Sequence, residues 1–271
     1  MTDHENPSFY IATGPHRFRP TSHATGPWSS QACHGGPPSA LAMHEILDCS
    51  APGDGEEPKK QISEVHIDLF GEIPLQPLEF TTTVLRPGKR IELVEAIGKL
   101  DSGRTAISAR AWRMLTEEGR AARVEAPVEL PSRGAGSKDP MMASFPYGDS
   151  IDWRFVEGGI SKKGPATAWA TPKIPLIEGV STTPIESALL VADSANGISA
   201  ELDFRDFIFI PTSAELQFRS QPLSTTVGLS AVTSINPAGF GTTRGTLFEE
   251  TGVYAHLLQS IYVEPRRPAG R

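Results

Sequence analysis

A histidine and two glycines, His34-Gly35-Gly36, stand directly before a proline at position 37 of this 271-residue chain. Pro37 suits the first turn of a helix, because its missing N–H would have no partner there. The unpaired N–H groups at a helix start attract negative charge, and glycine lets a ligand come close to the main chain. We therefore expect Gly35 and Gly36 to offer N–H donors to an oxyanion, with His34 beside them. The alternative is a plain glycine-rich turn that caps a core helix.

Two polar side chains in the second half of the chain stand among apolar neighbours. Asp193 ends the apolar run 188–192, where a carboxylate meets the unfavourable end of the helix dipole. Gln259 is the sole amide in YAHLLQSIYV (254–263), and strand alternation puts it on the same face as apolar residues. A buried amide needs partners, and a bound water would supply one. We expect Asp193 to face a cleft as a general base; the alternative is an exposed residue on the last helical turn.

Two segments with the same order of elements must position these residues. A helix is predicted over 34–46 and another over 184–196, where Thr183 and Glu186 form a capping box. The strand-like runs that follow each helix are 62–70, 78–85, 90–101 and 105–115 in the first segment, and 213–218, 225–235, 242–249 and 254–263 in the second. The chain before residue 33 and the segment 126–149 contain many glycines, prolines and other turn residues, so both are expected to be irregular.

The two segments can be aligned as a repeat. Ser39-Ala40-Leu41 falls on Ser187-Ala188-Leu189 at an offset of 148. The same offset, within one residue, pairs Glu64 with Thr212, Gly103 with Gly252 and Arg110 with Gln259. Asp193 then corresponds to Glu45, which makes Glu45 a second candidate acid.

The repeat predicts an α+β fold. One helix with about four antiparallel strands leaves a sheet edge bare, and two such units can pair their edges. We expect a tandem (double) hotdog, in which two long helices are each wrapped by an antiparallel sheet and the sheets join into one. The expected domains are an N-terminal hotdog over 1–125, a connector over 126–180 and a C-terminal hotdog over 181–271.

Composition limits the classes of function. The formal net charge of −7 argues against a general nucleic-acid binder, and no apolar run is long enough for a membrane span. Two cysteines make a disulfide framework improbable, so a reducing cytoplasm is expected. No metal or other cofactor is expected, because His34 has no second ligand at helical or hairpin spacing.

Three motifs together resemble a known family. CHGGPPSALAM (33–43), GPW (26–28) and the ending GTTRGTLFEETGVYAHLLQSIYVEPR (241–266) resemble the acyl-CoA thioesterase II family of the thioesterase-like superfamily, whose members are double hotdogs. The resemblance implies a catalytic set of Asp193, Thr212 and Gln259, which holds and activates a water that attacks the thioester. It also implies an acyl-CoA substrate, hydrolysed to the free acid and CoA by direct water attack.

The halves differ where chemistry is expected. Single-copy hotdog thioesterases often carry an acid nine residues after the histidine of HGG, and Met43 stands there in this chain. The second half keeps Asp193 but has 184–186, Pro-Ile-Glu, where HGG would lie. The two halves are therefore expected to build one composite site, with donors from the first and the base from the second.

Other functions stay open at this level. A double hotdog that binds acyl-CoA or lipid without turnover would share the same residues. A hotdog hydratase is disfavoured, because neither half shows the D-x-x-x-x-H arrangement that those enzymes carry. The pattern does not separate CoA from another pantetheine carrier. Units of this kind often pair again, so a homodimer is an open alternative to a monomer.

Overall fold

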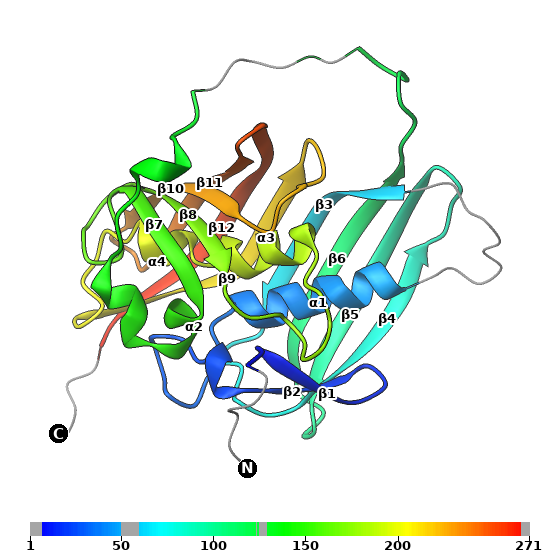
Figure 1. Ribbon diagram of the computed structural model, residues 1–271. Coiled ribbons are helices and arrows are strands. Elements are labelled where there is room, and N and C mark those ends of the chain that lie inside the picture. The colour runs from blue at the N-terminus through cyan, green and yellow to red at the C-terminus, as the bar shows by residue number, and fades with distance from the viewer. Residues whose placement is uncertain (1–6, 50–59, 123, 125–128, 267–271) are drawn as a thin grey trace.

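The computed structural model describes residues 7–49, 60–122, 124 and 129–266. Over these residues, twelve strands form one antiparallel sheet, and two helices, α1 and α3, pack against each other on it (Figure 1). The domain boundary predicted between residues 125 and 126 lies outside the described residues.

The elements follow in two similar series. The first series comprises β1 (Tyr10–Gly14), β2 (Arg17–Pro20), α1 (Gly36–Asp48), β3 (Lys60–Leu69), β4 (Leu78–Arg86), β5 (Ile91–Leu100) and β6 (Thr105–Leu115). The second comprises α2 (Pro146–Asp149), β7 (Ile151–Glu157), β8 (Ala166–Pro172), α3 (Pro184–Ala192), α4 (Ala195–Ile198), β9 (Phe207–Phe218), β10 (Val227–Asn236), β11 (Phe240–Glu249) and β12 (Gly252–Pro265). Short 3₁₀ helices cover Ser22–Ala24, Arg133–Ala135 and Pro140–Ser144.

The order of strands in the sheet reads the same from either edge. It runs β1-β2-β4-β5-β6-β3-β9-β12-β11-β10-β8-β7, so each half contributes its strands in the same sequence from edge to centre. The central strands β3 and β9 pair from Glu64 opposite Gln217 to Asp68 opposite Ser213. This pairing joins the two half-sheets, and the predicted α+β architecture is confirmed.

Four strands lie where the sequence pattern predicts none. β1 and β2 fall in the stretch before residue 33, and β7 and β8 fall inside 126–180. β1 and β2 are only five and four residues long and contain Gly14 and Pro20, which read as turn signals. β8 is ATAWATP, in which alanines mask the strand pattern. Much of the segment predicted as a connector therefore extends the sheet of the second half.

The first helix matches its prediction closely, whereas the second is interrupted. α1 begins at Gly36, two residues after the predicted start, and the capping box of Thr183 and Glu186 opens α3 as predicted. α3 ends at Ala192, and α4 begins only at Ala195. The carbonyl of Leu190, which would accept the next helical bond, instead accepts the hydroxyl of Tyr147 at 2.7 Å. The Ser194 N–H bonds to Val191 O at 3.0 Å instead, in a tighter turn that follows the end of α3.

The two helices bury most of their surface between the half-sheets. α1 contacts β4, β5 and β6, and α3 contacts β8, β10 and β11, while the helices contact each other. Leu41, Met43 and Ile46 of α1 are completely buried. Because burial of each such side chain stabilises the fold by about 1.5–3 kcal/mol, these contacts fix α1 firmly on the sheet.

Candidate active site

The start of α1 faces the break between α3 and α4. A Cβ atom on Gly35 would lie 2.7 Å from Oδ2 of Asp193, and one on Gly36 would overlap the main-chain oxygen of Leu190. The N–H groups of Gly35 and Gly36 donate hydrogen bonds to the Asp193 carboxylate. Gly35 and Gly36 of the first half and Asp193 of the second therefore lie together, and the close approach needs glycines. The two N–H groups face this carboxylate, and a role for them at an oxyanion stays a prediction.

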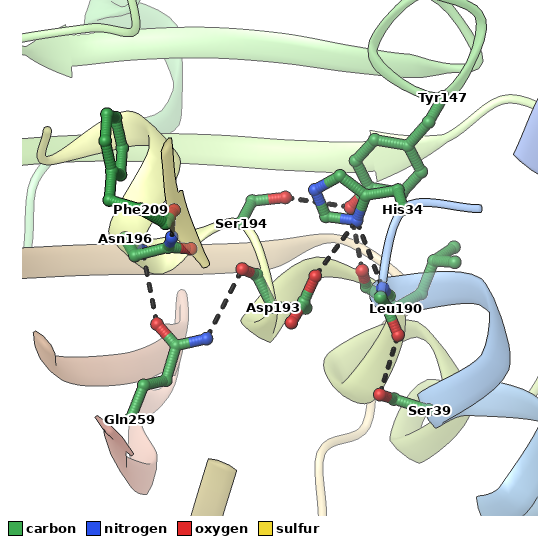
Figure 2. A network of polar contacts seen from close by, with 11 residues as sticks. His34, Ser39, Tyr147, Leu190, Asp193, Ser194, Asn196, Phe209 and Gln259 are labelled. Atoms are coloured by element: carbon green, nitrogen blue, oxygen red, sulfur yellow. Dashed lines mark hydrogen bonds and ion pairs between the residues drawn. The ribbon is translucent and has the colours of Figure 1, made fainter. Parts of the chain in front are cut away.

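The imidazole of His34 is fixed on three sides (Figure 2). Its Nδ1 lies 3.1 Å from Oδ2 of Asp193 and 3.1 Å from the main-chain nitrogen of Gly36. The ring stacks on Tyr147 with centroids 3.8 Å apart and an interplanar angle of 7°. His34 is thus held in one orientation against the carboxylate.

Burial determines the charges of this pair. Burial raises the pKa of Asp193 to about 7, and the hydrogen bonds from Gly35 and Gly36 oppose that rise. Burial lowers the pKa of His34 to about 3. The contact between them is therefore no ion pair near neutral pH: His34 is neutral, and Asp193 is divided between its two protonation states.

Tyr147 supports both His34 and the helix break. Its hydroxyl bonds to Leu190 O at 2.7 Å and lies 2.9 Å from Oγ of Ser194, so the fully buried ring cannot turn. Sequence reasoning missed this residue, because α2 lies in a proline- and glycine-rich stretch predicted to be irregular. The aromatic pair around Pro146, Phe145 and Tyr147, was the available signal.

Gln259 bridges the main chain on either side of the break. Its Nε2 donates to the carbonyl of Asp193 at 3.3 Å, and its Oε1 accepts the N–H of Asn196 at 3.2 Å. The side chain of Asn196 in turn donates to Phe209 O at 3.1 Å (Figure 2). Gln259 is completely buried. It lies beside Asp193, but its amide bonds to main-chain groups and not to the Asp193 carboxylate.

Thr212 sits in a β-bulge of β9. The pairing with β12 shifts there, and the hydroxyl donates to Ser260 O at 3.3 Å. Ser63 occupies a matching bulge in β3 and donates to Trp112 O at 3.3 Å. Thr212 therefore corresponds to Ser63 rather than to Glu64 as the sequence alignment predicts.

A one-residue correction in the opposite direction applies to Gln259. Its strand neighbours are Ala214 and Thr243, and it faces the helices. In the first half, Ala111 is the residue that faces the helices and pairs with the two corresponding strand positions. Arg110 is exposed on the other face of the sheet. The first half thus carries a small apolar residue at the position of the amide.

Glu45 lies away from this site. The carboxylate is nearly fully buried and contacts Nδ1 of His16 at 2.7 Å. It does not line the cavity described below, so its environment differs from that of Asp193. Met43, the other candidate position for an acid, is completely buried in the core.

A cavity of about 340 Å³ opens onto the site. One part of its wall is apolar and comes from both halves: Trp28, Leu69, Ile73, Met142, Phe145, Ile198 and Phe204. The polar lining includes Cys33, His34, Glu72, Tyr147, Asp193, Ser194, Asn196, Thr212, Tyr262, Glu264 and Arg266. The cavity therefore places an apolar surface next to the Asp193 carboxylate, as a site for an acyl group requires.

Comparison with known proteins places this architecture in a class. The chain is a double hotdog, similar to a conserved protein of unknown function with a hotdog fold from Alicyclobacillus acidocaldarius (12% identity, TM-score 0.72, covering 95% of this chain and 96% of that one). It also resembles a putative thioesterase II from Thermobifida fusca YX (13% identity, TM-score 0.71, covering 94% of this chain and 95% of that one). A third similar structure is the acyl-CoA thioesterase II TesB2 from Mycobacterium marinum (14% identity, TM-score 0.65, covering 97% of this chain and 97% of that one).

Family models identify the chain more closely. The acyl-CoA thioesterase N-terminal domain matches residues 24–114, and the acyl-CoA thioesterase C-terminal domain matches residues 124–263. The chain therefore belongs to the acyl-CoA thioesterase family, which confirms the resemblance read from the sequence. No curated protein matched it in sequence.

Over the described ranges, no helix is long and apolar enough to cross a membrane. In the same part of the chain, no group of three or more His, Cys, Asp or Glu side chains is arranged to hold a metal ion.

The raised pKa of Asp193 should make folding stability depend on pH. The folded protein binds this proton more tightly than the unfolded chain, in which the pKa is near the ordinary value of 3.8. The stabilisation from Asp193 is therefore complete below about pH 4 and is lost as the pH rises through about 7. Denaturant unfolding of the wild type and Asp193→Asn between pH 5 and 8.5 measures this. The wild type should lose stability relative to the variant as pH rises, and parallel curves would contradict the burial argument.

Proposed function

We propose that this protein hydrolyses acyl-CoA thioesters to the free acid and CoA by direct attack of water, with Asp193 as the general base. The observation that carries the proposal is the position of the carboxylate. The Asp193 carboxylate, at the end of α3, is buried against the start of α1 beside His34. It lines a largely apolar cavity built from both halves. Membership of the acyl-CoA thioesterase family supports the same substrate class.

The environment suits proton transfer at neutral pH. A base is most effective when its pKa lies near the working pH, and burial moves the pKa of Asp193 to about 7. The apolar wall would hold the acyl chain, which leaves the thioester carbonyl next to the carboxylate. A cytoplasmic location is part of this proposal, and it rests on membership of the acyl-CoA thioesterase family.

The hydrolysis itself is the test of the proposal. The protein is mixed with acyl-CoAs of several chain lengths and a thiol reagent that reports free CoA. Continuous release of CoA is expected. Saturable binding of acyl-CoA without release would instead identify a non-catalytic acyl-CoA-binding double hotdog, the alternative that the sequence leaves open.

A methyl group at Gly35 should act on the site more than on the fold. Gly35 has φ −67°, which alanine adopts freely, and the three atoms nearest the new Cβ all belong to the carboxylate group of Asp193. Gly35→Ala should therefore lower kcat by about tenfold, equivalent to ~1.4 kcal/mol in the barrier. Steady-state kinetics with thermal unfolding check this. Wild-type kcat in the folded variant would show that the carboxylate needs no such close approach.

Gln259 and Thr212 are proposed to place the reacting groups, without removing a proton. Gln259→Ala and Thr212→Ala should each reduce kcat by roughly tenfold, the scale of one hydrogen bond. Added to Asp193→Asn, either change should have little further effect, because the three residues act on one water. Double-mutant cycles measure this coupling, and strictly additive losses would separate Gln259 and Thr212 from the reaction.

A further inference from the structure

One ring nitrogen of His34 is left without a hydrogen-bond partner among the residues that the structure describes. Nδ1 contacts Asp193 and the Gly36 nitrogen, whereas Nε2 forms no hydrogen bond within the described part of the chain. Figure 2 shows Nε2 on the side of the ring away from Asp193. His34 lines the cavity, and its side chain keeps 11% of its surface exposed. His34 and Asp193 therefore both line the cavity where substrate and water would lie, and Nε2 is the ring nitrogen available to them.

Nδ1 cannot satisfy both of its neighbours in one tautomer. The Gly36 N–H, 3.1 Å away, needs a lone pair on Nδ1, and ionised Asp193 needs a proton there. When Nδ1 carries the proton, the Gly36 N–H still has the Asp193 carboxylate as its acceptor. When Asp193 is ionised, the proton sits on Nδ1, and Nε2 presents a lone pair to the cavity. When Asp193 is protonated, Nδ1 accepts hydrogen bonds, and the ring proton sits on Nε2. The protonation state of Asp193 therefore sets whether His34 accepts or donates a proton at the cavity.

We infer that His34 is a catalytic residue whose Nε2 exchanges protons with the reacting water and the leaving sulfur, while Asp193 stores the proton. This inference rests on the proposed thioesterase function. In the first step, the water oxygen bonds to the thioester carbon, and a water proton passes to Nε2. The Nδ1 proton moves to Oδ2 of Asp193, and the carbonyl π electrons move to oxygen.

The second step reverses the proton movement. The oxyanion re-forms its C=O bond, the C–S bond breaks with its electron pair on sulfur, and Nε2 gives its proton to the thiolate. Asp193 returns its proton to Nδ1, so the free acid and CoA thiol are formed and the pair is reset. In a Ser-His-Asp triad the aspartate does not become protonated. Here burial disfavours the imidazolium and favours neutral Asp193, which supports the opposite resting place for the proton.

The surrounding groups fit a fixed relay. Tyr147 stacks on the ring and is itself held by Leu190 and Ser194. The other ionisable side chains that line the cavity are Cys33, Glu72, Tyr147, Tyr262, Glu264 and Arg266. Burial raises the pKa of Cys33 to about 12 and also raises the pKa of Tyr147 above its ordinary value, so neither titrates near neutral pH.

Variants of His34 separate a relay from a purely orienting role. His34→Asn keeps an amide that can bond Asp193 but has no nitrogen at the position of Nε2. A relay predicts a loss of about 10²–10⁴-fold in kcat, similar to Asp193→Asn. Imidazole should partly restore His34→Ala but not Asp193→Asn. His16→Asn is the matched control, because His16 also bonds a buried carboxylate but lies outside the cavity.

The outcomes distinguish this inference from the thioesterase proposal. If the wild type hydrolyses acyl-CoA and His34→Asn keeps kcat within a few-fold, the relay is overturned and the proposed function stands. If the wild type releases no CoA, the proposed function fails. ¹⁵N NMR of the His34 ring in the wild type needs neither substrate nor variants. A switch from Nδ1–H to Nε2–H as the pH falls through about 7 supports the relay, and a fixed tautomer or an imidazolium overturns it.

Discussion

Asp193→Asn is expected to lower kcat/KM for acyl-CoA hydrolysis by about 10²–10⁴-fold, the usual loss when a positioned base is removed. Asparagine has nearly the same shape, so the main-chain contacts of Gln259 with Asp193 O and Asn196 N should survive. The variant loses the group that accepts the water's proton, directly or through His34. Steady-state kinetics at pH 8, where the wild-type carboxylate is ionised, give the clearest comparison.

Glu45→Gln is the matched control for this prediction. Like Asp193, Glu45 is a buried carboxylate bonded to a histidine nitrogen, but it does not line the cavity. Its amide variant should keep wild-type activity. Full activity in a folded Asp193→Asn, or an equal loss in Glu45→Gln, would remove Asp193 from the mechanism.

Gly36→Val is expected to give the largest loss of stability. The first added carbon would overlap the main-chain oxygen of Leu190 and lie 3.2 Å from Oη of Tyr147. Because a main-chain atom cannot move aside as a side-chain end can, α1 would have to shift. Overpacking of this kind usually lowers the free energy of unfolding by about 1–3 kcal/mol, and valine adds two methyl groups beyond the first carbon.

The stability of Gly36→Val is measured by thermal unfolding. A decrease of roughly 2–4 °C in Tm per kcal/mol is expected for a domain of this size. Gly134→Ala is a suitable control, because a Cβ there meets only Ser132 Oγ at 4.0 Å. An unchanged Tm would mean that α1 does not approach Leu190 so closely. Because Gly36→Val is expected to disturb the fold, a loss of activity in this variant would not show that the valine side chain blocks the thioester.

Local signals made much of the fold predictable. Proline at position 37 and the Thr183–Glu186 capping box marked the helix starts within two residues. The longer strands could be recognised from alternation and β-branched residues. β1, β2, β7 and β8 could not, because short strands owe their conformation to pairing with a neighbour rather than to their own residues.

The site was predictable in its parts but not in its connections. His34, Gly35 and Asp193 do lie together, which the split of motifs between the halves predicts. The contact of Tyr147 with Leu190 depends on the tertiary fold and left no periodic pattern. The matching bulges at Ser63 and Thr212 lie 149 residues apart, whereas Ala111 and Gln259 lie 148 apart, so no single offset pairs both sets of strand residues.

Hydrolysis of an acyl-CoA in H₂¹⁸O, followed by mass spectrometry of the products, tests the central claim most directly. The claim is that water, activated at Asp193, attacks the thioester. The wild type should release free CoA and a fatty acid that carries one ¹⁸O, and Asp193→Asn should release both far more slowly. Intact acyl-CoA after prolonged incubation with the wild-type protein, or an acyl group transferred to another acceptor without ¹⁸O, would contradict it.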